Sequence, residues 1–323
     1  VREIRGALSS AFEPRKKIIV LDLDNTLWGG VIGEDGIDGI ELADHKEGQR
    51  YYDFQRQLLE MKKRGILLAV VSKNNEEDAR KAISEHPSML LREDDFVTEK
   101  INWENKAVNI KEIESELNLT EGSFIFIDDN PIERGIVSGK CTEMYVPEFP
   151  ADTTELLGFA EDIWLDYCRP LRILGEDTKK TQMYQSEAKR KEAKINSLNL
   201  DDYIASLDMY VDVHRMRPEE LERTAQLCGK TNQFNLTTKR YTVEEIASIA
   251  EKSDSAVYVV HVTDKYGDSG LISVIILAEE QSNVRIDTFL MSCRVMGRKL
   301  EDVIMNEIAS RYSEKENLIG EYK

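Results

Sequence analysis

Over the first 150 residues, unbroken apolar runs alternate with amphipathic stretches. Ile18–Leu21 is the first such run, and a run without polar positions is typical of a strand buried on both faces of a parallel sheet. Similar runs predict strands at 66–71, 95–97, 123–127 and 144–146. Apolar residues at helical spacing predict helices over 51–63, 76–84 and 106–117. This alternation predicts a doubly wound α/β sheet with right-handed crossovers.

The pattern changes after about residue 200. Alternating and apolar segments predict strands at 209–214, 256–262, 270–277 and 284–291. Helices are predicted over 218–228, over 242–250 and from about 299 to 312. The intervening stretch, 151–200, is charged and helical in its periodicity. We therefore expect a first domain at 1–150, a helical linker at 151–200 and an α+β domain at 201–323.

Composition narrows the function classes. A hydrophobic content of 41% and a charged content of 32% are typical of a globular protein, and no apolar run approaches the length of a membrane helix. The net charge of −18 argues against nucleic acid as a partner. The four cysteines form no C-x-x-C pair, which argues against a cysteine zinc site and favours a reducing, cytoplasmic location. Because the sequence begins with Val1, we treat it as a potential fragment of a longer protein.

Polar side chains follow three of the predicted strands. Asp22 and Asp24 follow the first strand and point to one side of the chain, Ser72 ends the second, and Asp128 and Asp129 follow the strand at 123–127. The ends of parallel strands share one edge of a sheet, so these acids would repel each other strongly unless a cation lies between them. Oxygen ligands of this kind select Mg²⁺. A D-x-D string by itself has a competing interpretation, in which one aspartate caps the next element and the other is solvated.

Lys106 lies near the start of a predicted helix. Its charge could stabilise an aspartate nucleophile and the transition state of phosphoryl transfer; alone, it could equally be a solvated helix lysine. The glycine-rich stretch 29–39 predicts a short flap or hairpin. The intervals between Asn25, Ser72 and Lys106 are too short for a large cap domain. The site would therefore be open to a large substrate, unless the second domain serves as its lid.

D-x-D-N-T, a strand-terminal serine, a lysine and D-D-N-P occur in the order of the four motifs of the haloacid dehalogenase (HAD) superfamily, which the first domain resembles. The resemblance implies Asp22 as the nucleophile and Asp24 as the general acid and base. It implies that Ser72 and Lys106 are catalytic, and we add the neighbouring Asn74 as a substrate contact.

The same resemblance implies a capless HAD-type fold with Mg²⁺ as the cofactor. The metal ligands would be Asp22, the main-chain carbonyl of Asp24, and Asp129. Asp128 would ligate either directly or through water, an alternative that the sequence leaves open.

The second domain ends in a strand, R-x-x-G-x and a helix, with Arg294, Gly297 and Arg298 in the turn. It resembles the GNAT acetyltransferase fold, in which such a turn cradles a pyrophosphate. R-V-M-G-R-K lacks the usual final small residue. The whole chain resembles the FkbH-like family through five strings: D-L-D-N-T-L-W-G-G-V, I-N-W-E-N-K, D-D-N-P-x-E, T-N-Q-F-N-L-T-T-K-R-Y and S-C-R-V-M-G-R.

The FkbH-like resemblance implies a bifunctional enzyme for polyketide-type biosynthesis. It would take a glyceryl unit from the small phosphorylated substrate 1,3-bisphosphoglycerate and load it onto the phosphopantetheine arm of an acyl carrier protein. Two other hypotheses remain open. One is a plain Mg²⁺-dependent phosphatase acting on small phosphomonoesters, and the other is a non-catalytic scaffold that binds a carrier protein.

Cys293 is the preferred transfer thiol, because a neighbouring cation, Arg294, and the start of a helix both lower the pKa of a thiol. Cys228 is the weaker candidate, since a cysteine inside a helix is typical of a core. Cys293 could instead be a buried thiol at a strand end. Asn232 and Asn235 could orient the glyceryl hydroxyls or merely close their loop. Basic candidates for meeting an acidic carrier are Lys230, Lys239, Arg240, Arg294, Arg298 and Lys299.

Overall fold

The computed structural model describes residues 15–169, 179–229, 234–235 and 237–320, apart from the side chain of residue 293. The chain divides into two compact units, Val1–Ala188 and Lys189–Lys323, and each is described by itself. In the described residues, no helix combines the length and the apolar character needed to cross a membrane.

The first unit is built on a four-stranded parallel sheet with β1 in its interior. The strand order is β3-β2-β1-β4. The strands are β1 (Ile18–Leu21), β2 (Leu67–Ser72), β3 (Phe96–Ile101) and β4 (Phe124–Ile127). All four side chains of β1 are 0% exposed, as the unbroken apolar run predicts. The expected strand at 144–146 is present only as an isolated bridge between Ile125 and Tyr145.

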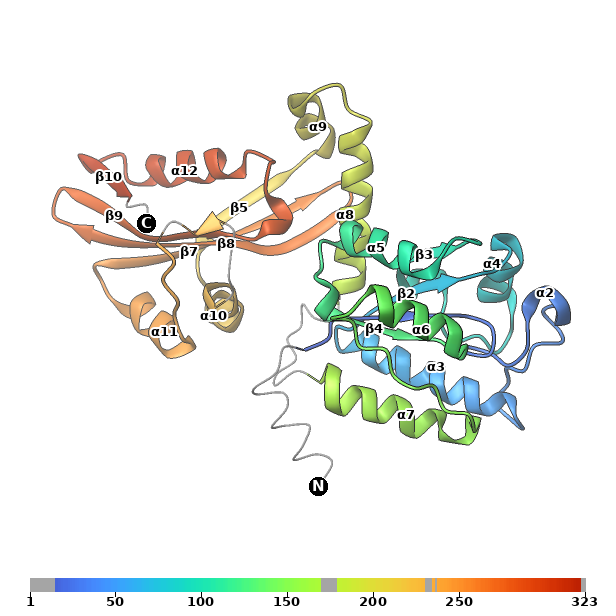
Figure 1. The fold of residues 1–323 in the computed structure, drawn as a ribbon. Helices are drawn as coiled ribbons and strands as arrows, with labels where there is room; N and C mark the ends of the chain where they lie inside the picture. Colours follow the sequence, from blue (N-terminus) through green and yellow to red (C-terminus); the bar gives the residue numbers. More distant parts are fainter. Residues whose placement is uncertain (1–14, 170–178, 230–233, 236, 321–323) are drawn as a thin grey trace. The chain divides into compact units, whose positions relative to one another are not determined.

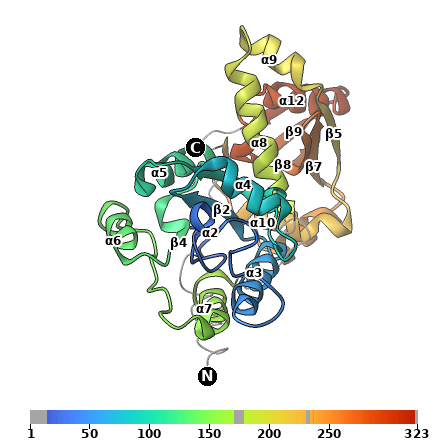
Figure 2. The same ribbon diagram turned by 90° about the vertical axis from the view of Figure 1, so that its right-hand side faces the viewer.

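Helices cover both faces of this sheet (Figures 1 and 2). One face carries α3 (Gly48–Lys63), α4 (Glu76–Glu85) and α7 (Leu156–Ile163), and the other carries α5 (Lys106–Leu117) and α6 (Pro131–Lys140). Successive strand residues alternate between the two cores, with Ile19 and Leu21 in one and Ile18 and Val20 in the other. The predicted doubly wound α/β fold is confirmed.

Two segments of this unit differ in detail from the expected pattern. Residues 29–41 contain a one-turn helix, α2 (Ile32–Asp35), closed by a bridge between Gly29 and Glu41, where a flap or hairpin was expected. Helix α7 lies in the stretch expected to be a linker, yet Leu156, Ala160 and Ile163 are buried in the core of the first unit.

The second unit contains a mainly antiparallel sheet of order β10-β9-β8-β7-β5, in which β10 runs parallel to β9. The principal strands are β5 (Tyr210–Arg215), β7 (Ser255–Asp264), β8 (Gly267–Glu280) and β9 (Asn283–Met291). Two short strands were not predicted, β6 (Phe234–Asn235), which pairs with β9, and β10 (Asn317–Gly320). The predicted α+β character of this half is confirmed.

Helices lie on both faces of the second sheet as well (Figure 1). One face packs against α12 (Leu300–Arg311), and the other packs against α10 (Leu221–Gly229) and α11 (Val243–Glu251). The chain leads into this sheet through α8 (Lys180–Ile195) and α9 (Leu200–Leu207). Helix α8 buries Arg190, whose guanidinium bonds Asp264 at 2.7 and 2.8 Å.

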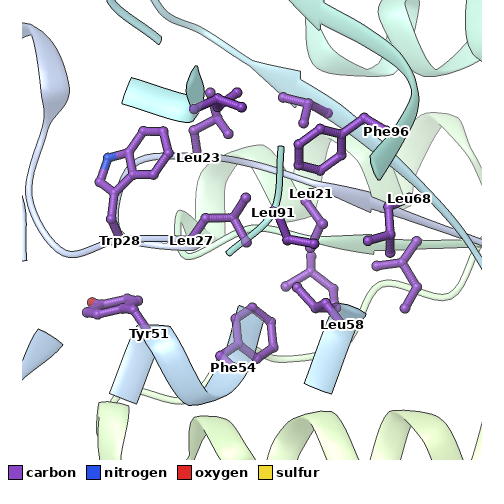
Figure 3. Close-up of a cluster of buried hydrophobic side chains, with 14 of the residues drawn as sticks. Leu21, Leu23, Leu27, Trp28, Tyr51, Phe54, Leu58, Leu68, Leu91 and Phe96 are labelled. Carbon is purple, nitrogen blue, oxygen red and sulfur yellow. The ribbon is translucent and has the colours of Figure 1, made fainter. Parts of the chain in front are cut away.

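The loop after β1 is held by apolar burial. Leu23, Leu27 and Trp28 are 0% exposed, and Figure 3 shows them in one cluster with Tyr51 and Phe54 of α3. Gln55 of α3, also 0% exposed, anchors this loop to the helix, because its Nε2 donates to the carbonyl of Leu27 at 2.8 Å. Its Oε1 accepts from the backbone N–H groups of Leu90 and Leu91 at 3.0 and 3.3 Å.

Replacing this glutamine tests the anchor. Gln55→Leu keeps the volume but leaves a carbonyl and two N–H groups without their partner, and each unpaired buried group costs about 1–3 kcal/mol. We expect the free energy of unfolding to fall by roughly 2–4 kcal/mol in urea titrations, since part of the loss is recovered by burying an apolar side chain. Gln57→Leu, on the same helix, is the control and should stay within about 0.5 kcal/mol of the parent. Equal stabilities of the two variants would contradict this role of Gln55.

Candidate active site

The register of the first sheet brings the predicted polar residues to one edge. Leu21 pairs with Val70 of β2 and with Ile127 of β4, so the next residues along these strands lie side by side. Asp22 continues this ladder by donating its N–H to the carbonyl of Ile127 at 3.0 Å. Ser72, the last residue of β2, is 2% exposed at the same edge. The ends of three adjacent strands therefore meet as the sequence predicts.

Three carboxylates converge at this edge. Asp22, Asp128 and Asp129 each offer an oxygen, and these oxygens lie within 4.8 Å of one another. Asp22 is 6% exposed and Asp128 is 0% exposed, so water screens their mutual repulsion poorly. Such a group is stable only when positive charge is supplied or when a proton is bound.

Lys106 supplies part of that charge. It is the first residue of α5, whose N-terminus is capped by the Asn105 side chain, and it is 4% exposed. Its Nζ lies 2.9 Å from Asp22 Oδ1 and 2.6 Å from Asp128 Oδ2. Burial by itself would lower the pKa of Lys106, but the two carboxylates outweigh it and raise that pKa. The side chain is thus held as an ammonium ion between two aspartates.

One lysine does not balance three acids. Burial, followed by the charge of Asp22, raises the pKa of Asp128 to about 6. The same two causes raise the pKa of Asp129. Asp22 Oδ1 is buried, and Lys106 Nζ lies 2.9 Å from it. Converging hard oxygen donors whose charge one lysine does not balance fit a Mg²⁺ ion, which Asp22, Asp128 and Asp129 would hold.

Asp24 is held separately from these three acids. Its Oδ1 accepts from Trp28 Nε1 at 2.9 Å and from the N–H of Ile32 at 3.0 Å, and its Oδ2 accepts from Asn74 Nδ2 at 2.8 Å. These donors come from three different segments of the chain. Asn74, expected as a substrate contact, therefore positions the Asp24 carboxylate in this structure.

Sequence reasoning missed the groups that orient the two acids after β4. Thr26 Oγ1 accepts the N–H of Asp129 at 3.1 Å. Arg134 of α6 donates to the main-chain carbonyls of Asp128 and Asp129 at 2.9 and 2.7 Å. Thr26 belongs to the D-x-D-N-T string, but Arg134 gave only a weak signal, as a cation one helical turn after Asn130.

The turn between β9 and α12 depends on two left-handed residues. Gly297 has φ +76°, and Lys299, the N-cap of α12, has φ +55°. Cys293 begins a 3₁₀ turn (Cys293–Val295), and its side chain lies outside the described residues. Asn232 and Lys230 also lie outside them. Asn235 Oδ1 accepts from the N–H groups of Thr237 and Thr238, so in this structure it closes its own loop.

The basic candidates of the second unit differ in exposure. Lys239 pairs with Asp287 at 2.5 Å, Lys299 pairs with Asp201 at 2.6 Å, and Arg240 is exposed. Arg294 is half-buried, with its Nε 3.4 Å from Ser292 Oγ.

Arg298 is only 3% exposed. Its Nη1 lies 3.6 Å from the buried Asp264, and its Nη2 donates to the carbonyl of Arg294. Its guanidinium is therefore placed to brace the turn from inside and offers almost no surface to a carrier protein.

The described cysteines are poor nucleophiles. Burial raises the pKa of Cys228 to about 12, and Cys228 is 0% exposed. Burial likewise raises the pKa of Cys168 to about 12, and it raises that of Cys141. Because the thiolate is the reactive form, Cys228 lacks the setting of a transfer thiol.

Comparison with known proteins gives partial matches to solved structures. No protein-family model and no curated protein sequence matches the chain. One similar structure is the N-terminal part of protein BF1531 from Bacteroides fragilis, described as containing a phosphatase domain complexed with Mg. The two are 38% identical over 50% of this chain and 44% of that one, with a TM-score of 0.48.

Two further similar structures are N-acetyltransferases. The ribosomal-protein-S18-alanine N-acetyltransferase from Escherichia coli is 7% identical over 32% of this chain and 61% of that chain, with a TM-score of 0.26. The ribosomal-protein-alanine N-acetyltransferase from Brucella melitensis is 12% identical over 35% of this chain and 81% of that chain, with a TM-score of 0.30. None of these descriptions names the FkbH-like family.

Removing one carboxylate tests the metal site. In Asp129→Asn, repulsion within the cluster falls, so the protein without metal should melt at a higher temperature than the parent. Mg²⁺ should raise the melting temperature of the parent and should raise that of the variant far less, with at least about ten-fold weaker Mg²⁺ affinity by calorimetry. Asp44→Asn, at an exposed acid of the same unit, is the control. Equal Mg²⁺ affinity in the parent and Asp129→Asn would exclude this ligand.

The raised pKa of Asp128 gives a pH dependence with a defined sign. Its folded pKa of about 6 exceeds the ordinary value of 3.8, so its stabilising protonated form is lost as pH rises from about 4 to 6. Without metal, the stability of the parent relative to Asp128→Asn should therefore decrease over that interval, by on the order of 2 kcal/mol. Urea titrations at a series of pH values measure it. If the stability of the parent relative to Asp128→Asn stays constant or increases between pH 4 and 6, Asp128 is ionised over that whole interval.

Proposed function

We propose that this protein is a bifunctional enzyme that removes phosphate and transfers an acyl unit, and specifically that it loads a glyceryl unit from 1,3-bisphosphoglycerate onto an acyl carrier protein. The observation that carries the hydrolytic half is the convergence of Asp22, Asp128 and Asp129 around the Nζ of Lys106. A buried acid cluster of this kind is costly to maintain without a charged partner, and a phosphoryl substrate with its metal ion supplies one. Mg²⁺ is the ion we propose, because the candidate ligands Asp22, Asp128 and Asp129 all offer carboxylate oxygens.

Asp22 is the proposed nucleophile. Its carboxylate oxygen forms a bond to phosphorus while the bond from phosphorus to the leaving alcohol oxygen breaks, and Asp24 gives that oxygen a proton. Asp24 then takes a proton from water, whose oxygen attacks the same phosphorus. The bond to Asp22 breaks, its electron pair returns to the carboxylate, and inorganic phosphate leaves. A bound Mg²⁺ would offset the negative charge of the phosphoryl oxygens.

The other residues at this edge of the sheet position the two aspartates and the phosphoryl group. Lys106 holds Asp22 close by, with its Nζ 2.9 Å from Asp22 Oδ1, and its charge would stabilise the transition state of phosphoryl transfer. Ser72, at the end of β2, is the proposed donor of a hydrogen bond to a phosphoryl oxygen. Asn74 and Trp28 fix the Asp24 carboxylate by hydrogen bonds of 2.8 and 2.9 Å, so that its orientation is set before substrate binds.

The transfer half is proposed for the second unit. The thiolate of Cys293 attacks the acyl carbon of 1,3-bisphosphoglycerate and a carbon–sulfur bond forms. The bond from that carbon to the phosphate oxygen breaks, and inorganic phosphate leaves with the electron pair. The carrier's phosphopantetheine thiol loses its proton to solvent and attacks the thioester, and Cys293 departs as a thiolate. The glyceryl unit still carries a phosphomonoester on its third carbon, which is the bond that the first unit hydrolyses.

Three features support this assignment. The strings through which the chain resembles the FkbH-like family lie in both units. The three described cysteines have raised pKa values, which leaves Cys293 as the candidate thiol. Residues 25–105 hold α2, α3, β2, α4, a 3₁₀ turn at Glu93–Asp95, β3 and the loops that join them. They contain no inserted cap domain to enclose the edge where a bulky carrier-bound substrate would enter.

The proposal is tested by two assays on the same variants. The protein, Mg²⁺, 1,3-bisphosphoglycerate and a phosphopantetheinylated carrier should yield a carrier heavier by one glyceryl unit in intact-protein mass spectrometry. Asp22→Asn should slow phosphomonoester hydrolysis by at least about 10³-fold, because the nucleophile is lost. Cys293→Ala should abolish transfer and leave hydrolysis of small phosphomonoesters unchanged. Asp44→Asn serves as the control in both assays.

The outcomes separate the competing functions. Hydrolysis without any carrier loading, across several candidate carriers, would leave a plain phosphatase. Loading that persists in Cys293→Ala would place the transfer thiol elsewhere. Hydrolysis that is equal in the parent and in Asp22→Asn would overturn the catalytic role of the acid cluster.

A further inference from the structure

A second cluster of metal-binding side chains lies in the other unit, on β5, β7 and the short 3₁₀ turn Pro218–Glu220. His214, Glu220 and His261 each offer one ligand atom, and these atoms lie within 4.8 Å of one another. The Nε2 atoms of both histidines lie 3.0 Å from the same atom, Glu220 Oε1. No step of the proposed reactions uses these residues.

The fold brings the three residues together by register. Strands β5 and β7 are antiparallel, and Asp212 lies directly opposite His261. His214, two residues further along β5, points to the same face as Asp212 and lies diagonal to His261. The two imidazoles are stacked, with ring centroids 5.5 Å apart and planes inclined by 18°.

Glu220 is held in place before any ligand binds. Its Oε2 accepts the N–H of Arg217 at 2.8 Å, which is half of a capping box at the start of the turn that leads into α10. The other carboxylate oxygen is thereby left to face both histidines. The side chains of His214, Glu220 and His261 are 17, 11 and 32% exposed, so the cluster is shielded but open to water.

His214 lies between two carboxylates. Its Nδ1 is buried and lies 3.0 Å from Asp212 Oδ2 without the alignment of a hydrogen bond, and its Nε2 is 3.0 Å from Glu220 Oε1. A neutral imidazole has one proton, so it leaves one of its nitrogen lone pairs facing a carboxylate oxygen. A cation bound at Nε2 removes this conflict, because the remaining proton then lies on Nδ1 toward Asp212. A carboxylate behind a ligating histidine is the usual outer partner in metal sites.

We propose that His214, Glu220 and His261 bind a transition-metal dication of the Zn²⁺ type, with Asp212 orienting His214. Two imidazole nitrogens and a carboxylate suit Zn²⁺ far better than Mg²⁺, which takes oxygen ligands. Three protein ligands leave a coordination position for water. The ion would join β5, β7 and the start of α10. The cysteine spacing, which argues against a cysteine zinc site, does not bear on these ligands.

Zinc titration of the chelator-stripped, reduced protein tests the site. In isothermal calorimetry with excess Mg²⁺ present, the parent should bind one Zn²⁺ per chain at this cluster. His261→Ala and His214→Ala should each weaken that binding by at least about 100-fold, because a ligand is lost. Asp212→Asn should weaken it by about ten-fold, as expected for an outer partner. His45→Ala, which changes an exposed histidine of the first unit, should leave it unchanged.

A second variant and a spectroscopic measurement guard against misfolding. Glu220→Gln keeps the side-chain oxygen that the capping box needs but loses the charged ligand. It should melt near the parent without metal and still bind Zn²⁺ at least about ten-fold more weakly. Co²⁺ added to the parent should give visible d–d absorption that Zn²⁺ displaces and that His261→Ala lacks. Equal Zn²⁺ affinity and stoichiometry in the parent and the three ligand variants, or no Co²⁺ absorption in the parent, would overturn the proposal.

Discussion

The repulsion among the carboxylates at the edge of the parallel sheet is the constraint that organises the first unit. Asp22 and Asp128 are buried by the same apolar strands that place them, so their charges cannot be relieved by moving into water. Lys106, in the first turn of α5, balances part of this negative charge. The helix must therefore begin at that point, which explains why an asparagine cap stands immediately before the lysine.

Much of the first unit could be predicted because its strands carry unambiguous patterns. Ile18–Leu21 has no polar position, and the structure buries it between two neighbouring strands. Short elements were predicted less well. Residues 144–146 form only one bridge, and β10 (Asn317–Gly320) is an edge strand whose four residues have no strong alternation. Such segments take their conformation from the strand beside them, which a local pattern does not reveal.

The candidate site shows the same division. The acids and Lys106 could be found in the sequence because they follow strands or begin a helix at motif spacing. The partners of Asp24 could not, since Trp28, Ile32 and Asn74 meet it only after two loops have folded. For Arg298 the sequence-based prediction of a carrier contact was wrong. Its charge suggested a surface role, but the structure buries it beside Asp264. Long-range contacts of this kind carry no periodic signal.

The interior position of β1 ties chemistry to the stability of the whole unit. Its backbone is hydrogen-bonded on both sides, to β2 and to β4, and none of its side chains reaches solvent. Amide protons in such a strand exchange only when the entire cooperative unit opens. Asp22 follows β1, and Asp128 and Asp129 follow β4, so separation of these two central strands would part the acids in one event. The alignment of this edge should therefore be lost together with the cooperative opening of the sheet.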